Sequence, residues 1–229
     1  MDSIAKLART TKTLTFDCYG TLIDWYAGLR ESLGDIFGDA IGNRWDEVVI
    51  EYVRAEAEIE SQSFRKYRDV LRSTVEKLAR DWGISLPAGR SLVLGDQLPS
   101  WSPFPDTADA LRRLRSRFRL GILSNIDRDL LAKTVQLIGV EFDFVVTAED
   151  VQSYKPAPGH FERLLGRHAD RGSIIHVAQS LFHDGTAAKQ HGLPFVWINR
   201  YNDPPRPPVP MVRQYADLRT MADELCGEE

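Results

Sequence analysis

The sequence has little cysteine, no long apolar run and no excess of one charge, and each shortage excludes a class of protein. Only two cysteines, Cys18 and Cys226, occur among 229 residues, so neither a disulfide framework nor a Cys-x-x-Cys metal site is expected. No run approaches the roughly 20 apolar residues that a membrane-spanning helix needs, and residues 1–12 lack the apolar core of a signal peptide. We therefore expect a cytoplasmic protein that has no membrane partner.

Charge and histidine spacing exclude two further classes. Lys and Arg number 29 against 33 Asp and Glu, which gives a formal net charge of −4, and no long block of one sign interrupts this balance. A nucleic-acid partner is therefore not expected. The 5 histidines show no metal-ligand spacing, so no metal site is predicted either. What the chain does have is 43% hydrophobic residues, enough for one α/β core with an insertion.

Short apolar runs, rich in β-branched and aromatic residues, predict buried parallel strands. They span residues 13–19, 119–124, 142–147, 173–179 and 194–199. Amphipathic segments of helical length accompany the later runs, at residues 106–117, 127–139, 158–169 and 182–192. Strands that alternate with helices in this way predict an α/β fold built on a doubly wound parallel sheet.

The segment from Trp25 to Leu98 breaks this alternation. It has helical periodicity and almost no strand signal, as in "EVVIEYVRAEAEIESQSF". We expect it to form a helical cap (25–98) inserted after the first strand, with 1–24 and 99–229 forming the α/β core. The proline-rich stretch "PSWSPFPD" at 99–106 predicts the return linker, since proline suits boundaries better than helices or strands.

Polar residues follow the predicted strands at the points where the strands end. In open α/β sheets, ligands bind outside the carboxyl ends of the strands, so these residues are expected to share one crevice. Singly, each has a purely structural alternative, such as a helix cap or a residue favoured by the helix dipole. Together they offer carboxylate, hydroxyl, amide and ammonium groups, and they comprise Asp17, Ser124, Asn125, Lys155, Gln179, Ser180 and Asp184.

The segments "FDCYGTLID", "LSN", "YKP" and "HVAQSLFHD" resemble, in order and spacing, the four motifs of the haloacid dehalogenase-like hydrolases. "WINR" at 197–200 is similar to the strand that closes the site in the L-2-haloacid dehalogenase branch. The resemblance covers nearly the whole chain, but 25–98 matches the family's cap by position and length only. It implies that Asp17 is a nucleophile, used in the family for phosphoryl transfer or for hydrolysis of a carbon–halogen bond.

Two departures from the family pattern favour carbon–halogen hydrolysis. A phosphatase of this family uses Mg²⁺ held partly by a fourth-motif carboxylate, and an acid two residues after the nucleophile. Here Tyr19 takes the second position, and Ala178 and Gln179 replace Gly-Asp in the fourth motif. A halide leaves without a proton, so neither carboxylate is needed. We therefore predict a metal-independent 2-haloacid dehalogenase without a cofactor. A Mg²⁺-dependent phosphatase and a non-catalytic binding protein are the alternatives.

The resemblance also implies roles for the site residues. Asp17 would attack C2 of a short 2-haloalkanoate and form an ester that water then hydrolyses. Lys155 would keep Asp17 ionised, and Asp184 would orient Lys155 and help to activate the water. Ser124 and the backbone N–H groups after Asp17, beginning with Cys18, would bind the substrate carboxylate or the oxyanion.

The remaining candidates would orient or enclose the substrate. The matching motif positions imply orienting roles for Thr21, Asn125 and Ser180, and Tyr19 is a candidate wall of an apolar pocket. In the cap, Arg54 is the candidate receptor for the halide. Arg68 competes for that role, and a solvated helix arginine is the structural alternative for Arg54. The resemblance further implies a homodimer.

Overall fold

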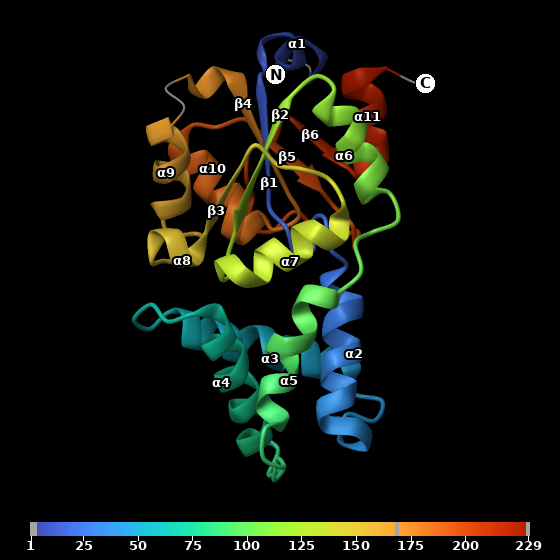
Figure 1. Cartoon of the computed structure of the whole chain (residues 1–229), viewed down its shortest axis with the longest axis vertical. Coiled ribbons are helices and arrows are strands. Elements are labelled where there is room, and N and C mark those ends of the chain that lie inside the picture. The colour runs from blue at the N-terminus through green and yellow to red at the C-terminus, as the bar shows by residue number, and fades with distance from the viewer. Residues whose placement is uncertain (1–3, 168–169, 228–229) are drawn as a thin grey trace.

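The structure is a computed structural model in which residues 4–167 and 170–227 are described. All its strands form one six-stranded parallel sheet in the order β3-β2-β1-β4-β5-β6, shown in Figure 1. The strands are β1 (Thr13–Phe16), β2 (Arg119–Ser124), β3 (Phe144–Thr147), β4 (Ile174–Ala178), β5 (Phe195–Ile198) and β6 (Arg213–Tyr215). The doubly wound α/β prediction is confirmed.

The sequence did not predict β6, which pairs with β5 at the edge of the sheet. Arg213 and Gln214 are exposed and only Tyr215 is buried. A strand of three residues with only one of them buried leaves no apolar run to detect, and short polar strands are common at sheet edges.

Helices cover both faces of the sheet, each over its own buried cluster (Figure 1). The larger cluster includes Leu114, Leu131 and Leu218, and the smaller includes Phe161 and Ala187. On the side of the larger cluster lie α6 (Thr107–Arg115), α7 (Arg128–Ile138) and α11 (Leu218–Cys226), and on the other α9 (Gly159–Arg167) and α10 (Thr186–His191). The shorter elements of this part are α1 (Ile4–Thr10), α8 (Ala148–Val151), η4 (Arg171–Ser173) and the π-helical turn η5 (Leu181–Gly185).

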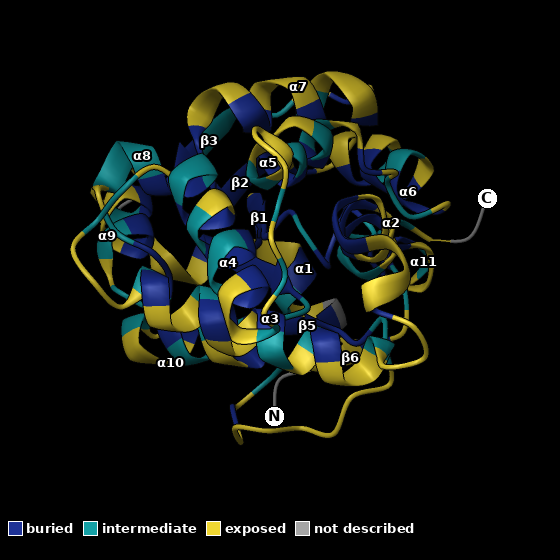
Figure 2. Ribbon diagram, turned by 90° about the horizontal axis from the view of Figure 1, so that it is seen from below, coloured by how far each residue is buried: buried dark blue, intermediate teal, exposed yellow. Residues whose placement is uncertain are grey.

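The central strand β1 positions the candidate site. Its residues pair with β2 on one side and β4 on the other, so that Phe16 lies between Ile122 and Val177. All of β1 is buried, and it appears dark blue at the centre of Figure 2. The strand order reverses beside β1, because β2 and β3 lie on one side and β4 and β5 on the other. Asp17 follows at the carboxyl end, where such folds place their ligands.

The helices that follow β1 pack together below the sheet in Figure 1. They are α2 (Trp25–Phe37), α3 (Trp45–Glu60), α4 (Tyr67–Asp81) and α5 (Val93–Gln97), with the short turns η1 (Gly38–Ala40), η2 (Arg90–Leu92) and η3 (Leu98–Ser100). We call α2 to α5 the cap helices. α3 packs on α4, and α5 packs on both α2 and α4. No strand lies among them, as the periodicity predicted.

One buried carboxylate fastens the cap helices to the sheet. Asp127, at the start of α7, accepts hydrogen bonds from the backbone N–H groups of Tyr67 (2.8 Å) and Arg68 (3.0 Å). These are first-turn groups of α4, which have no partner inside the helix and lie at its positive end. Asp127 is fully buried, so this contact fixes where α4 begins relative to the sheet.

Two glycines of α2 provide a matched test of cap packing. A β-carbon at Gly28 would collide with the indole of Trp101, whose Nε1 donates to Ser32 Oγ at 3.0 Å. A β-carbon at Gly34 meets no atom within 4 Å. We predict that Gly28→Ala lowers the free energy of unfolding by about 1–3 kcal/mol, whereas Gly34→Ala raises it by about 0.5–1 kcal/mol. Urea unfolding measures both, and equal shifts would contradict the packing.

Candidate active site

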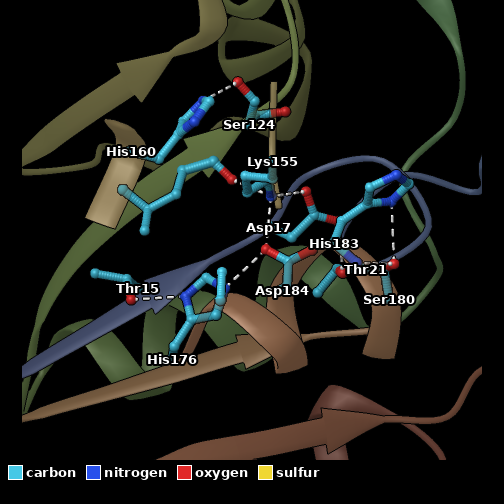
Figure 3. Close-up of polar contacts among 12 residues, drawn as sticks. Thr15, Asp17, Thr21, Ser124, Lys155, His160, His176, Ser180, His183 and Asp184 are labelled. Carbon is cyan, nitrogen blue, oxygen red and sulfur yellow. Dashed lines mark hydrogen bonds and ion pairs between the residues drawn. The ribbon is translucent and has the colours of Figure 1, made fainter. Parts of the chain in front are cut away.

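A buried ammonium joins two carboxylates at the carboxyl end of β1 (Figure 3). Lys155 Nζ lies 2.9 Å from Asp17 Oδ1, 2.6 Å from Asp184 Oδ1 and 2.7 Å from the carbonyl oxygen of Leu123. An ammonium has three hydrogens to donate, so each one has an acceptor here. The predicted nucleophile, the lysine and the fourth-motif aspartate therefore meet in one cluster, although they come from distant parts of the chain.

The three groups of this cluster shift one another's pKa. Burial raises the pKa of Asp17 above its ordinary value, against the opposing charge of Lys155. Burial acts in the same direction on Asp184, but Lys155 and His176 hold the pKa of Asp184 well below its usual range. Burial disfavours the ammonium of Lys155, yet the charges of Asp17 and Asp184 keep its pKa above the ordinary value. Asp17 is therefore the first of the two carboxylates to take up a proton as the pH falls.

His176 holds Asp184 from the far side. Its Nε2 lies 2.8 Å from Asp184 Oδ1 and its Nδ1 lies 2.9 Å from Thr15 Oγ1. An ionised carboxylate only accepts hydrogen bonds, so Nε2 carries the hydrogen and Nδ1 accepts from the Thr15 hydroxyl. The other oxygen, Asp184 Oδ2, is buried and has no hydrogen-bond partner among the described residues. One acceptor of Asp184 is therefore unused among the described residues.

Two of the predicted orienting residues hold the cluster in place. Thr21 Oγ1 donates to Asp17 Oδ2 at 3.0 Å and accepts from the backbone N–H of Gln179 at 2.9 Å. Asn125 brackets the backbone of Lys155, since its Oδ1 accepts from the N–H at 2.6 Å and its Nδ2 donates to the carbonyl at 3.1 Å. Thr21 is fully buried and lies outside the cavity lining, so it can act on a substrate only through Asp17, which its hydrogen bond orients.

A cavity of about 600 Å³ opens beside Asp17, between the sheet and the cap helices. Ser124 and Tyr19 line it as expected, and the Tyr19 hydroxyl lies 2.7 Å from Thr134 Oγ1. Ser180 also lines it and accepts from the N–H of His183 at 3.1 Å. The Cys18 side chain is buried in the core and does not reach the cavity, so any contact of Cys18 with a substrate is restricted to its backbone.

The cap arginine expected to receive a halide is not in the cavity. Val53, Glu56 and Glu60 line it, and their spacing of three and four residues places them on one face of α3. Arg54, rotated by about 100° from Val53 on the helix, is exposed and outside the lining. Its placement is therefore corrected. Arg68 is not in the lining either, because it pairs with Asp129 at 2.6 Å.

Among the residues at the site that sequence reasoning missed, two acids in the cavity lining and two buried histidines bear on its chemistry. The spacing of four between Glu56 and Glu60 places them on one face of a helix, and this signal is present in the sequence. The family resemblance led us to expect a cation in the cap, not an acid. His176 and His160 carried no such signal, because a histidine in a strand or helix does not reveal its partner. His160 Nε2 donates to the carbonyl of Ser124 at 3.1 Å, and burial lowers the pKa of His160 to about 3, so it is neutral at neutral pH.

Comparisons with known proteins agree with this geometry. The sequence profile of the haloacid dehalogenase-like hydrolases matches residues 11–192. The chain belongs to this family. It is 32% identical to an (S)-2-haloacid dehalogenase of Pseudomonas putida over 82% of this chain and 85% of that one. It is 29% identical to the haloacetate dehalogenase H-2 of Moraxella sp. strain B, over 83% and 86% of the two chains.

A solved structure shows that the fold is shared as well. The L-2-haloacid dehalogenase of Xanthobacter autotrophicus, with chloropropionic acid covalently bound, superposes with a TM-score of 0.79, covering 96% of this chain and 100% of that one at 18% identity. Together with the sequence relatives, this places the chain in the L-2-haloacid dehalogenase branch of the family, as its motifs predicted.

The buried ionic cluster gives a stability prediction. Lys155→Met leaves Asp17 and Asp184 without a cation, and we expect it to lower the free energy of unfolding at pH 7 by about 3–5 kcal/mol. The depressed pKa of Asp184 contributes stability above its unfolded pKa of about 3.9, and this stability is lost as the pH falls through the folded value. The difference in the free energy of unfolding between wild type and Lys155→Met should therefore become smaller below pH 4. Urea unfolding at several pH values measures it, and a constant difference would contradict the pairing.

Proposed function

We propose that this hydrolase cleaves the carbon–halogen bond of short 2-haloalkanoic acids, such as haloacetates, by nucleophilic attack of Asp17. The contact of Asp17 with Lys155 at 2.9 Å beside the cavity carries the proposal. A lysine ammonium keeps a buried carboxylate ionised, and only an ionised carboxylate is a nucleophile. The names of the relatives, which are dehalogenases of 2-haloacids and of haloacetate, support the same substrate class.

In the first step, an oxygen of Asp17 attacks C2 of the haloacid from the side opposite to the halogen. The new C–O bond forms as the carbon–halogen bond breaks, and the halide leaves with the bonding pair. The product is an ester between the Asp17 carboxyl group and C2. Thr21 donates to Asp17 Oδ2 and Lys155 to Oδ1, which fixes the plane of the carboxylate before attack.

In the second step, water attacks the carbonyl carbon of the Asp17 ester. The breaking bond lies between that carbon and the oxygen joined to C2, so the 2-hydroxy acid leaves with an oxygen that came from Asp17. The water must lose a proton, and the carboxylate of Asp184, a residue of the cavity lining, is the proposed acceptor. The same proton then passes to the leaving C2 oxygen and completes the hydroxyl group of the 2-hydroxy acid. Lys155 and Ser124 are the proposed partners for the developing oxyanion.

The residues at the site support a reaction without a metal ion. Among residues 4–167 and 170–227, no group of three or more histidine, cysteine or acidic side chains is arranged to hold a metal. The positions that distinguish phosphatases are engaged otherwise: the Tyr19 hydroxyl contacts Thr134, and Gln179 Nε2 donates to Asp203 at 2.9 Å. We keep a Mg²⁺-dependent phosphatase as the competing proposal.

The other parts of the sequence interpretation stay proposals. We propose that 1–24 and 99–229 form the catalytic core and 25–98 the cap domain, which the packing of the cap helices supports. In the described part of the chain, no helix is both long and apolar enough to cross a bilayer. A cytoplasmic setting and a homodimer stay predictions.

A substrate panel tests the proposal. Wild-type protein with EDTA should release halide from chloroacetate, bromoacetate and 2-chloropropionate. Asp17→Asn should reduce release to the uncatalysed background, since an amide is not a nucleophile. Asp35→Asn, an exposed change in α2, serves as the matched control and should retain the wild-type rate. Phosphate release from p-nitrophenyl phosphate that rises with Mg²⁺, with no halide release, would favour the phosphatase instead.

The raised pKa of Asp17 gives a pH prediction. Attack requires the ionised form, so kcat/KM should fall as the pH drops through a pKa above the ordinary value of an aspartate. Initial rates of halide release between pH 4 and 8 measure this limb. Full activity down to the ordinary aspartate pKa of about 3.9 would show that Asp17 is not the titrating nucleophile.

A further inference from the structure

Carboxyl groups outnumber cations in the lining of the cavity, although the proposed substrate is itself an anion. Its lining includes five carboxyl groups, those of Asp17, Glu56, Glu60, Asp184 and Asp203, but only one amino group, that of Lys155. All three donors of Lys155 are already used. A haloalkanoate is an anion, so ionised carboxylates on the cap side of the cavity would repel it.

The two cap carboxyl groups differ in their partners. Glu56 Oε1 accepts hydrogen bonds from the hydroxyls of Tyr52 and Tyr67, each at 2.8 Å. Glu60 lies one turn later on the same face of α3, and its side chain has no hydrogen-bond partner among the described residues. Burial raises the pKa of Glu56 as well, but the hydrogen bonds from Tyr52 and Tyr67 act in the opposite direction, whereas Glu60 has no such bonds in the described part of the chain. Two carboxyl groups spaced by four residues on a helix are close neighbours, so a charge on one disfavours a charge on the other.

We propose that Glu60 works as a neutral carboxylic acid and donates a hydrogen bond to the anionic haloacid in the cavity. This proposal rests on the proposed function, because it concerns the same cavity and substrate class. A carboxylic acid offers one O–H donor. Glu60 lies on α3, the same cap helix as Arg54, which the sequence predicted to bind the halide. Glu60 thus supplies a hydrogen-bond donor in place of the arginine that the cavity lacks.

The surroundings of Glu60 agree with a neutral acid. Burial, together with the charge of Glu56 and against that of Lys155, raises the pKa of Glu60 to about 9. The titratable groups that face it come from α3, α4, the loop before α9, and η5, and they are Glu56, Tyr52, Tyr67, Tyr154, Lys155 and His183. Burial raises the pKa of these tyrosines and lowers that of His183 to about 4. Among the described residues that face Glu60, Lys155 is therefore the only cation at neutral pH.

Two substitutions of Glu60 distinguish the effect of its hydrogen-bond donor on the rate from the effect of its size. Glu60→Gln keeps the size and an N–H donor, so it should retain more of the wild-type kcat/KM for haloacids near pH 7 than Glu60→Leu does. Glu60→Leu removes the donor and should lose about 10-fold to 150-fold in kcat/KM, the effect of one hydrogen bond to a charged group. The wild-type rate should also fall as the pH rises through about 9, because ionisation removes the hydrogen, and Glu60→Gln should lack this alkaline limb.

The matched control is Glu58→Gln on the same helix. Glu58 is exposed, pairs with Lys77 at 3.6 Å and lies outside the cavity lining, so its substitution should leave rate and pH profile unchanged. A Glu60→Gln variant that is folded but as impaired as Glu60→Leu would overturn the proposal. An alkaline limb that persists in Glu60→Gln would also overturn it.

A stability measurement tests the protonation without any activity. A raised folded-state pKa gives stability that is complete below the unfolded pKa of about 4.3 and is lost as the pH rises through the folded value. Urea unfolding should therefore show wild type losing stability relative to Glu60→Gln between pH 5 and 9. A difference in the free energy of unfolding that does not change with pH overturns the proposal. If wild type shows this stability shift but releases halide from none of the haloacids, the result would count against the proposed function and not against the protonation of Glu60.

Discussion

The ionic contact of Lys155 with Asp17 and Asp184 is the interaction on which the rest of the site depends. All three groups are buried, and moving charges out of water is expensive unless each finds a well-placed partner. The sheet supplies those partners at its carboxyl edge: Asp17 follows β1, Leu123 lies in β2 and Asp184 lies in the turn after β4. The parallel topology is therefore what brings the charges within hydrogen-bond distance.

The same contact decides which chemistry the carboxylate of Asp17 can perform. Burial raises the pKa of Asp17, and the charge of Lys155 opposes this shift. Thr21 donates to Asp17 Oδ2, while His176 holds Asp184 Oδ1, so the second oxygen of Asp184 has no partner among the described residues. The cap then closes the cavity with Glu56 and Glu60, whose acidity must be suppressed if an anionic substrate is to enter.

The fold and the shared crevice could be predicted from the sequence because both depend on local pattern, whereas the contact of Lys155 with Asp17 and Asp184 was implied by the family resemblance alone. Apolar runs that end in polar residues mark buried strands and their carboxyl ends, which is why Asp17, Lys155 and Asp184 were placed in one crevice. β6 escaped because Arg213 and Gln214 are exposed and leave no apolar run.

The cap was less predictable, because function there depends on helix phase. Val53 lines the cavity, whereas Arg54, the next residue along the helix, is exposed outside the lining. The sequence alone does not determine which face of a helix is turned toward a sheet. The support of Asp184 by His176 and Thr15 is likewise a contact between distant residues that no spacing reveals. The structure supplies these contacts, and with them the acidic character of the cavity.

The most direct test of the account is a single turnover in water enriched in ¹⁸O, with enzyme in excess over haloacid. If Asp17 forms an ester that water cleaves at its carbonyl carbon, the 2-hydroxy acid should carry ¹⁶O from the enzyme, and mass spectrometry should find ¹⁸O in the peptide that contains Asp17. Product that carries ¹⁸O from the first turnover, with an unlabelled peptide, would mean that water attacks C2 directly and would contradict the account.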